Sequence, residues 1–105
     1  MSIYRVGKFL HITFVWSFFP RTDVLEKVVF PTSKDWMRYA PNCWIVYTYV
    51  DASEWFRRIK PHVSDRDKFL ICELNVEDKQ GWMDKWVWEW LNKEREGDGT
   101  REMIP

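Results

Sequence analysis

The sequence predicts an α+β domain: a four-stranded antiparallel sheet with two helices on one face, followed by a further tryptophan-rich helix. Three observations support this fold class. Alternating apolar stretches typical of strands are interspersed with short stretches that carry helix-start signals. Their order is strand, helix, strand, strand, helix, strand and helix. The 105 residues are enough for one hydrophobic core.

The first half of the chain is expected to hold a strand, a helix and a second strand. Residues 9–16 alternate with the period of a strand. Thr22 or Asp23 is placed to cap a helix, and Pro31 would end it because proline has no N–H to donate. Residues 35–40 fit either a helical turn or a strand, and their alternation favours the strand.

The second half of the chain is expected to form a strand, a short helix and another strand before the last helix. Residues 43–49 are β-branched and aromatic, as in a central strand. Asp51 and Glu54 have the spacing of a capping box, so a helix should begin there and stop before Pro61. Residues 69–76 form the next strand. The residues of this helix expected to face the core are Trp55, Phe56 and Ile59.

A last helix is expected from Gly81 to about Arg95, so that residues 1–95 form one domain and 96–105 a frayed tail. On a helical wheel its apolar residues span about half the circumference. Trp88 falls outside that arc and is expected to be the most exposed. Eight tryptophans are many for a small domain to bury, which predicts a partner or dimer interface at Trp82, Trp86, Trp88 and Trp90. The alternative is that these side chains cover the second face of their own sheet.

Composition narrows the function classes. Sixteen basic residues balance sixteen acidic ones, so no global field favours nucleic acid or an anionic membrane. Cys43 and Cys72 are expected to be buried free thiols, which favours the cytoplasm. The apolar run 9–19 has no small-residue cleavage site and is too short to span a bilayer.

Side chains with possible chemistry are few, and we expect no catalytic, cofactor-binding or metal-binding residue. His11 and His62 are far apart and lack zinc-site spacing, so His11 is expected to be a strand residue with a hydrogen-bonded ring. Glu73 has no visible acid–base partner. The densest basic stretch could contact phosphates, but acidic residues interrupt it and favour a solvated face. It contains Arg57, Arg58, Lys60, Arg66 and Lys68.

Several short segments together match a known family: residues 42–46 with Thr48, the acidic helix start at 51–54, residues 65–69, the pair Trp90-Leu91, and Trp36. On these residues the chain resembles, over residues 9–93, the small bacterial SinR-like proteins. The resemblance implies a ferredoxin-like βαββαβ fold, related to the CRISPR spacer-integration subunit and to VapD-type ribonucleases. It also implies a homodimer. Those nucleases carry a metal-binding Asp at the end of the first strand, where this chain has Val15, which offers no oxygen to a cation.

Three function classes follow. The first is a non-enzymatic, homodimeric module that binds another protein. The second is a nucleic-acid-binding relative of the nucleases that lost the metal-binding Asp and uses the basic stretch. The third is a residual nuclease that works through another acid. The first class is favoured, and fold resemblance alone does not choose among them.

Overall fold

The computed structural model describes residues 6–95, and the expected frayed tail 96–105 lies outside that range. Four strands form one antiparallel sheet in the order β2-β3-β1-β4. The strands are β1 (Lys8–Val15), β2 (Asp35–Ala40), β3 (Cys43–Thr48) and β4 (Lys68–Leu74). The predicted α+β class with a four-stranded antiparallel sheet is therefore confirmed, as is the strand at 35–40.

The first helical segment runs from residue 22 to residue 32 in three parts. These are α1 (Thr22–Val24), the π-helical η1 (Leu25–Val29) and the 3-10 turn η2 (Phe30–Thr32). The expected cap at Thr22 or Asp23 is wrong: Arg21 precedes the helix, and no side chain caps it. Pro31 lies inside η2, where a 3-10 turn accommodates the missing N–H.

The second helix, α2 (Ala52–Ile59), begins where expected and is followed by the 3-10 turn η3 (Lys60–His62). The Asp51 carboxylate accepts a hydrogen bond from the backbone N–H of Glu54 at 3.0 Å. The Glu54 side chain does not complete a capping box, since it binds arginines instead. Phe56 was expected in the core, but it is 49% exposed.

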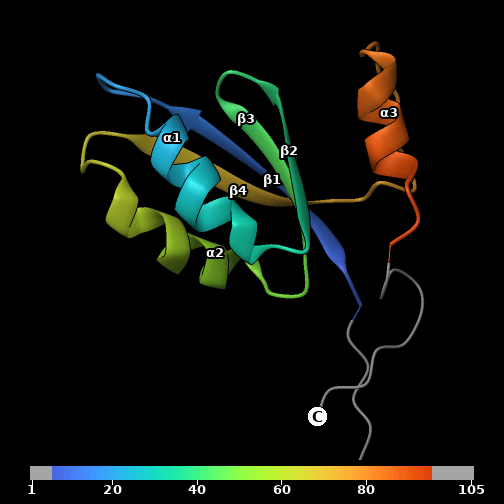
Figure 1. Cartoon of the computed structure of the whole chain (residues 1–105), viewed down its shortest axis with the longest axis horizontal. Helices are drawn as coiled ribbons and strands as arrows, with labels where there is room; N and C mark the ends of the chain where they lie inside the picture. Colours follow the sequence, from blue (N-terminus) through green and yellow to red (C-terminus); the bar gives the residue numbers. More distant parts are fainter. Residues whose placement is uncertain (1–5, 96–105) are drawn as a thin grey trace, which may run out of the picture.

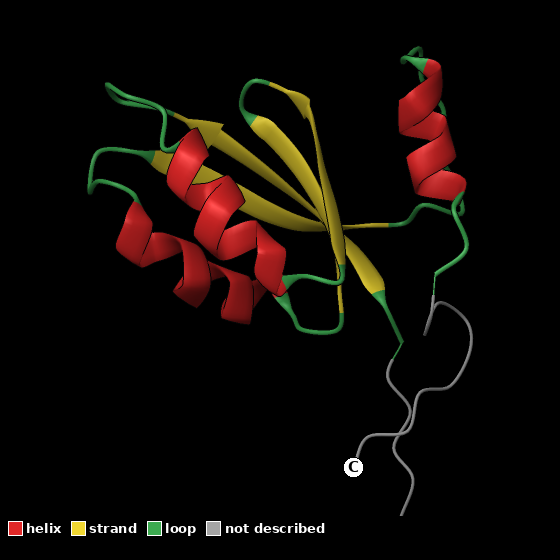
Figure 2. Cartoon of the chain, viewed as in Figure 1, coloured by secondary structure: helices red, strands yellow, loops and turns green. Residues whose placement is uncertain are grey.

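The last helix, α3 (Lys85–Asn92), is shorter than expected because residues 81–84 belong to the long connection after β4. Helices α1–η2 and α2 lie side by side on one face of the sheet, here called the first face (Figure 1). Helix α3 stands apart from them (Figure 2). Its buried residue Val87 packs on the opposite face, here called the second face.

Two separate clusters of apolar side chains hold these layers together. The first-face cluster consists of Leu10, Ile12, Phe14, Leu25, Val29, Phe30, Trp44, Val46, Trp55 and Ile59. The second-face cluster consists of Phe9, Met37, Ile45, Tyr47 and Val87. Strand alternation sends neighbouring residues of β1 to opposite clusters, which is why residues 9–16 are apolar at nearly every position.

Candidate functional site

The most exposed apolar side chains of the C-terminal region are Trp82, Met83 and Trp86, here called the tryptophan patch. Trp82 is fully exposed, while Met83 and Trp86 are 39% and 46% exposed. Trp82 and Met83 precede the first turn of α3, so the helix does not turn them toward the sheet. Exposed apolar groups of this size mark interaction surfaces more often than isolated surface residues do.

The expectation that Trp88 would be the most exposed tryptophan is wrong. Trp88 is half-buried, and its ring lies 3.6 Å from the position that a Cβ on Gly81 would take. Trp90 is half-buried as well and meets Phe9 edge to face, with ring centroids 5.8 Å apart. Of the four tryptophans expected at an interface, two therefore pack within the chain and two are available at the surface.

Arg95 fastens the end of α3 to the sheet. Its side chain is only 5% exposed and pairs with the Asp35 carboxylate at 3.3 Å. It also donates hydrogen bonds to the backbone carbonyls of Trp90 and Lys93. The guanidinium lies 4.3 Å from the Trp90 ring centroid and 5.3 Å from that of Tyr47. Sequence reasoning missed this contact, because residues 60 positions apart form it.

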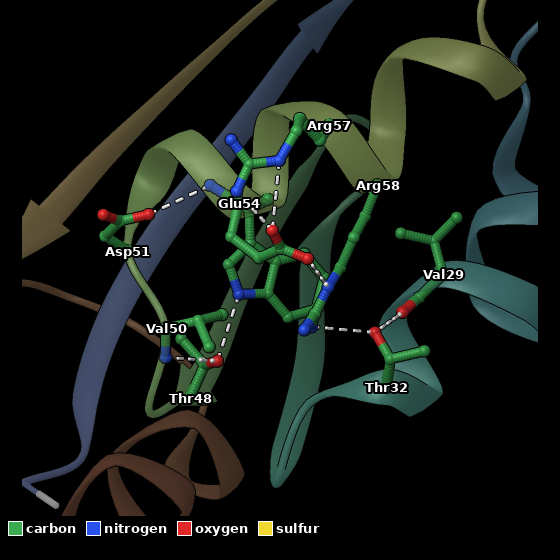
Figure 3. A network of polar contacts seen from close by, with 9 residues as sticks. Val29, Thr32, Thr48, Val50, Asp51, Glu54, Arg57 and Arg58 are labelled. Carbon is green, nitrogen blue, oxygen red and sulfur yellow. Dashed lines mark hydrogen bonds and ion pairs between the residues drawn. The ribbon is translucent and has the colours of Figure 1, made fainter.

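Three of the five residues of the basic stretch pair with nearby carboxylates, and Figure 3 shows the contacts of Arg57 and Arg58. Arg57 and Arg58 both bind Glu54, with nitrogen–oxygen distances of 2.5 and 3.1 Å. Hydrogen bonds from these two arginines lower the pKa of the Glu54 carboxyl. Lys60 pairs with Asp65 at 3.2 Å. The structure therefore does not form a single phosphate-binding surface from these residues.

Arg66 and Lys68 are exposed, and within residues 6–95 neither has a carboxylate partner among the ion pairs. The Asp67 carboxylate between them accepts hydrogen bonds from the backbone N–H groups of Ser17 and Ser64, at 2.8 and 2.9 Å. Burial alone would raise the pKa of Asp67, but these hydrogen bonds lower it. Asp67 thus ties the loop before β4 to the end of β1, a structural role.

A polar cluster on the second face joins three strands. The imidazole of His11 (β1) and the hydroxyl of Tyr39 (β2) form a 2.5 Å hydrogen bond, so the His11 ring is hydrogen-bonded as expected. The hydroxyl of Thr13 lies 3.4 Å from the sulfur of Cys43 (β3). Burial lowers the pKa of His11; burial, followed by Cys43, raises that of Tyr39 to about 12. Both groups are neutral near pH 7, and the hydrogen bond to Tyr39 engages one nitrogen of the His11 ring.

The other candidate residues are dispersed. His62 is half-buried in η3, whereas Glu73 and Cys72 are exposed on β4. The expectation that both thiols would be buried is therefore wrong, since Cys72 is exposed and Cys43 is only half-buried. Within residues 6–95 no three histidine, cysteine or acidic side chains lie close enough to hold a metal ion. Val15 ends β1 and is 64% exposed.

A second exposed aromatic pair, missed by the sequence reasoning, lies at the opposite end of β1 from Phe9. Phe18 and Phe19 are 80% and 65% exposed, and their rings meet edge to face with centroids 4.5 Å apart. They follow the run of strand residues without interruption, which is why the periodicity did not distinguish them.

No family model matches the chain, and neither the curated proteins nor the solved structures include a significant match. Among the described residues, no helix is both long enough and apolar enough to cross a membrane.

Proposed function

We propose that the protein is a non-enzymatic, cytoplasmic protein-binding module that associates with a second copy of itself through the tryptophan patch. The observation that carries the proposal is the full exposure of Trp82 beside the exposed Met83 and Trp86. Tryptophan and methionine are enriched in the cores of protein interfaces. Arg95 fastens the other end of α3 to the sheet, so the patch lies at the start of a docked helix and on the segment just before it.

The charges beside the patch fit a second copy. Lys85 and Glu89 lie one helical turn apart, are 90% and 64% exposed, and pair with each other at 3.6 Å. Trp86 lies between them in sequence. A two-fold axis that crosses α3 at right angles at the level of residue 87, next to Trp86, would place two α3 helices antiparallel and bring Lys85 of each copy to Glu89 of the other. Two identical patches then meet with opposite charges facing each other.

We also propose that the fold is ferredoxin-like, as the resemblance to SinR-like proteins implies. The order β2-β3-β1-β4 supports this class. The helical segment 22–32 connects β1 to β2 with β3 between them, and α2 connects β3 to β4 with β1 between them. Two such interleaved β-α-β units with both helices on one face are the pattern of a ferredoxin-like sheet.

The alternative, a nucleic-acid-binding relative of the nucleases that lost the metal-binding Asp, is supported mainly by Arg66 and Lys68. Two unpaired cations supply little of the phosphate neutralisation on which such binding depends. The exposed apolar surface of the tryptophan patch supports protein binding more strongly than two cations support nucleic-acid binding. We therefore place this alternative second.

The test is sedimentation equilibrium of the purified chain over a range of concentrations, for wild type and for Trp82→Ala/Trp86→Ala. The wild type should dimerise, and the double variant should dimerise at least roughly 30-fold more weakly, which corresponds to ~2 kcal/mol for a buried tryptophan anchor. Phe18→Ser/Phe19→Ser is the matched control, because it removes exposed aromatic area elsewhere, and it should dimerise like wild type.

A charge exchange tests the geometry of the contact. Lys85→Glu and Glu89→Lys should each weaken the dimer, and the double exchange should restore it, since the opposite charges would again face each other. A wild-type chain that is monomeric at every concentration refutes the homodimer. A chain that purifies with nucleic acid and releases it as salt rises would favour the alternative function instead.

A further inference from the structure

A polar cavity lies where the end of α3 meets the sheet, away from the tryptophan patch. Its volume is about 310 Å³, within the range of small-molecule sites. It is lined by Lys34, Asp35, Tyr47, Tyr49, Lys93, Glu94 and Arg95. These residues come from the turn before β2, from β2 itself, from the end of β3 and from the segment after α3. The cavity therefore exists only when the chain beyond α3 is docked.

Three cations and two carboxylates line this cavity, which leaves an excess of one positive charge. Arg95 and Lys93 share the single carboxylate of Asp35, at 3.3 and 3.4 Å. One carboxylate therefore serves two cations, and Lys93 remains 60% exposed. Glu94 is an exposed side chain on the same rim.

Lys34 supplies a cation that is not paired within the described residues. Its backbone N–H donates to the Tyr47 carbonyl at 2.9 Å, which fixes where the side chain starts. Its ammonium group lies 5.1 Å from the centre of the Tyr49 ring. Among residues 6–95, no carboxylate lies within ion-pair distance of this group. A cation held over an aromatic wall of the cavity can still accept an anionic ligand.

We infer that this cavity binds a small organic phosphate. Lys34 and Lys93 would contact the phosphate dianion, and the Tyr49 ring would hold the Lys34 ammonium group in place beside it. Arg95 remains bound to Asp35 and forms the floor of the site. The inference is independent of the proposed dimer, because the cavity and the tryptophan patch share no residue.

The experiment is isothermal titration calorimetry of the full chain with AMP, inorganic phosphate and adenosine, followed by AMP titrations of three lysine variants. We expect AMP and phosphate to bind and adenosine not to bind. Lys34→Gln and Lys93→Gln should each weaken AMP binding at least about tenfold, since each removes a charge-assisted contact. Lys60→Gln, which removes a lysine from an ion pair outside the cavity, should bind AMP as wild type does.

Amide shifts in an NMR titration place the ligand at this cavity independently of the variants. Changes on adding AMP should be largest at Lys34, Asp35 and Tyr49. The inference is overturned if AMP gives no binding at millimolar concentration, or if adenosine binds as tightly as AMP. It is also overturned if Lys60→Gln weakens binding as much as Lys34→Gln, because the contact would then be a general charge effect.

Discussion

Ten buried side chains fill the space between the sheet and the helices on its first face, whereas five fill the space on its second face. The first-face helices each add buried residues at helical spacing, such as Leu25 and Val29 or Trp55 and Ile59. Helix α3 buries only Val87 and depends on Arg95 to hold its end. The first face is therefore stabilised by a continuous apolar core, and the second by a few specific contacts.

The difference matters for function because both proposed sites lie on the weakly held side. The tryptophan patch is on α3 or just before it, and the cavity includes residues that follow α3. Segments with few buried apolar contacts open at lower free energy than the core does. The comparison can be sharpened by substitutions that act on one face at a time.

The largest effect is expected from Trp44→Ala on the first face. Trp44 is fully buried, packs edge to face on Phe14 at 5.3 Å and donates its indole N–H to Glu26 at 2.9 Å. Truncation should lower the free energy of unfolding by about 3–5 kcal/mol, because it leaves a cavity in the core and removes the hydrogen bond to Glu26. Urea unfolding measures this change.

Trp82→Ala is the matched control for that substitution. The same atoms are removed from a fully exposed site, so the free energy of unfolding of the monomer should change by less than about 0.5 kcal/mol. A large loss of stability in Trp82→Ala would show that its side chain is covered within the chain, and the tryptophan patch would lose its basis.

A smaller effect, confined to the second face, is expected from Arg95→Met. Methionine keeps apolar contact with Trp90 and Tyr47 but loses the Asp35 ion pair and the hydrogen bonds to two carbonyls. The opening free energy of α3 should fall by about 1–3 kcal/mol. Amide hydrogen exchange should show faster exchange in α3 and unchanged exchange in β3.

Lys93→Met is the control, since Lys93 binds the same Asp35 carboxylate from a largely exposed position. It should alter α3 exchange by less than about 0.5 kcal/mol. Equal effects of the two substitutions would mean that the charge on Asp35, rather than the buried guanidinium, holds the helix.

The smallest effect concerns pH and the polar cluster. Burial lowers the pKa of His11 below its ordinary value of 6.5, so the unfolded chain binds a proton more readily than the native chain. The His11 contribution to stability is therefore complete above about pH 6.5 and decreases as the pH falls toward the native pKa. The ring should titrate below 6.5 by NMR, and His11→Gln should remove this part of the acid destabilisation. A ring that titrates at or above 6.5 would contradict the burial.

The parts of the fold that the sequence predicted are those set by local pattern. Strand β3 follows from its β-branched and aromatic run, and α2 begins where Asp51 caps it. The register across the sheet could not be read locally. The pairing of β2 with β3 shifts at a bulge between Arg38 and Ala40, and Tyr39, which lies at this bulge, bonds to His11. Nothing in residues 35–40 signals the shift.

The candidate site was predicted only in part, because it too depends on contacts and helix ends that local sequence does not encode. A tryptophan-rich interface was expected, but the helical wheel was drawn from Gly81, whereas α3 begins at Lys85. Extending the wheel over the non-helical residues assigned Trp82 to the buried arc, although it is fully exposed. Trp88 lies outside that arc on any wheel, and it is half-buried with its ring beside Gly81 in the connection before α3. The cavity depends on Arg95 meeting Asp35, a contact between distant residues that no local pattern encodes.

Strand β1 lies between β3 and β4, so the first strand to be synthesised is an inner strand of the finished sheet. Its partner β3 ends at Thr48, and its other partner β4 ends at Leu74. At 5–20 residues per second, translation needs roughly 3–13 s to proceed from β1 to the end of β4. For that time a strand whose first face is apolar, at Leu10, Ile12 and Phe14, has an open edge available to neighbouring chains. A lower growth temperature and a low expression level should therefore favour recovery of folded protein over aggregate.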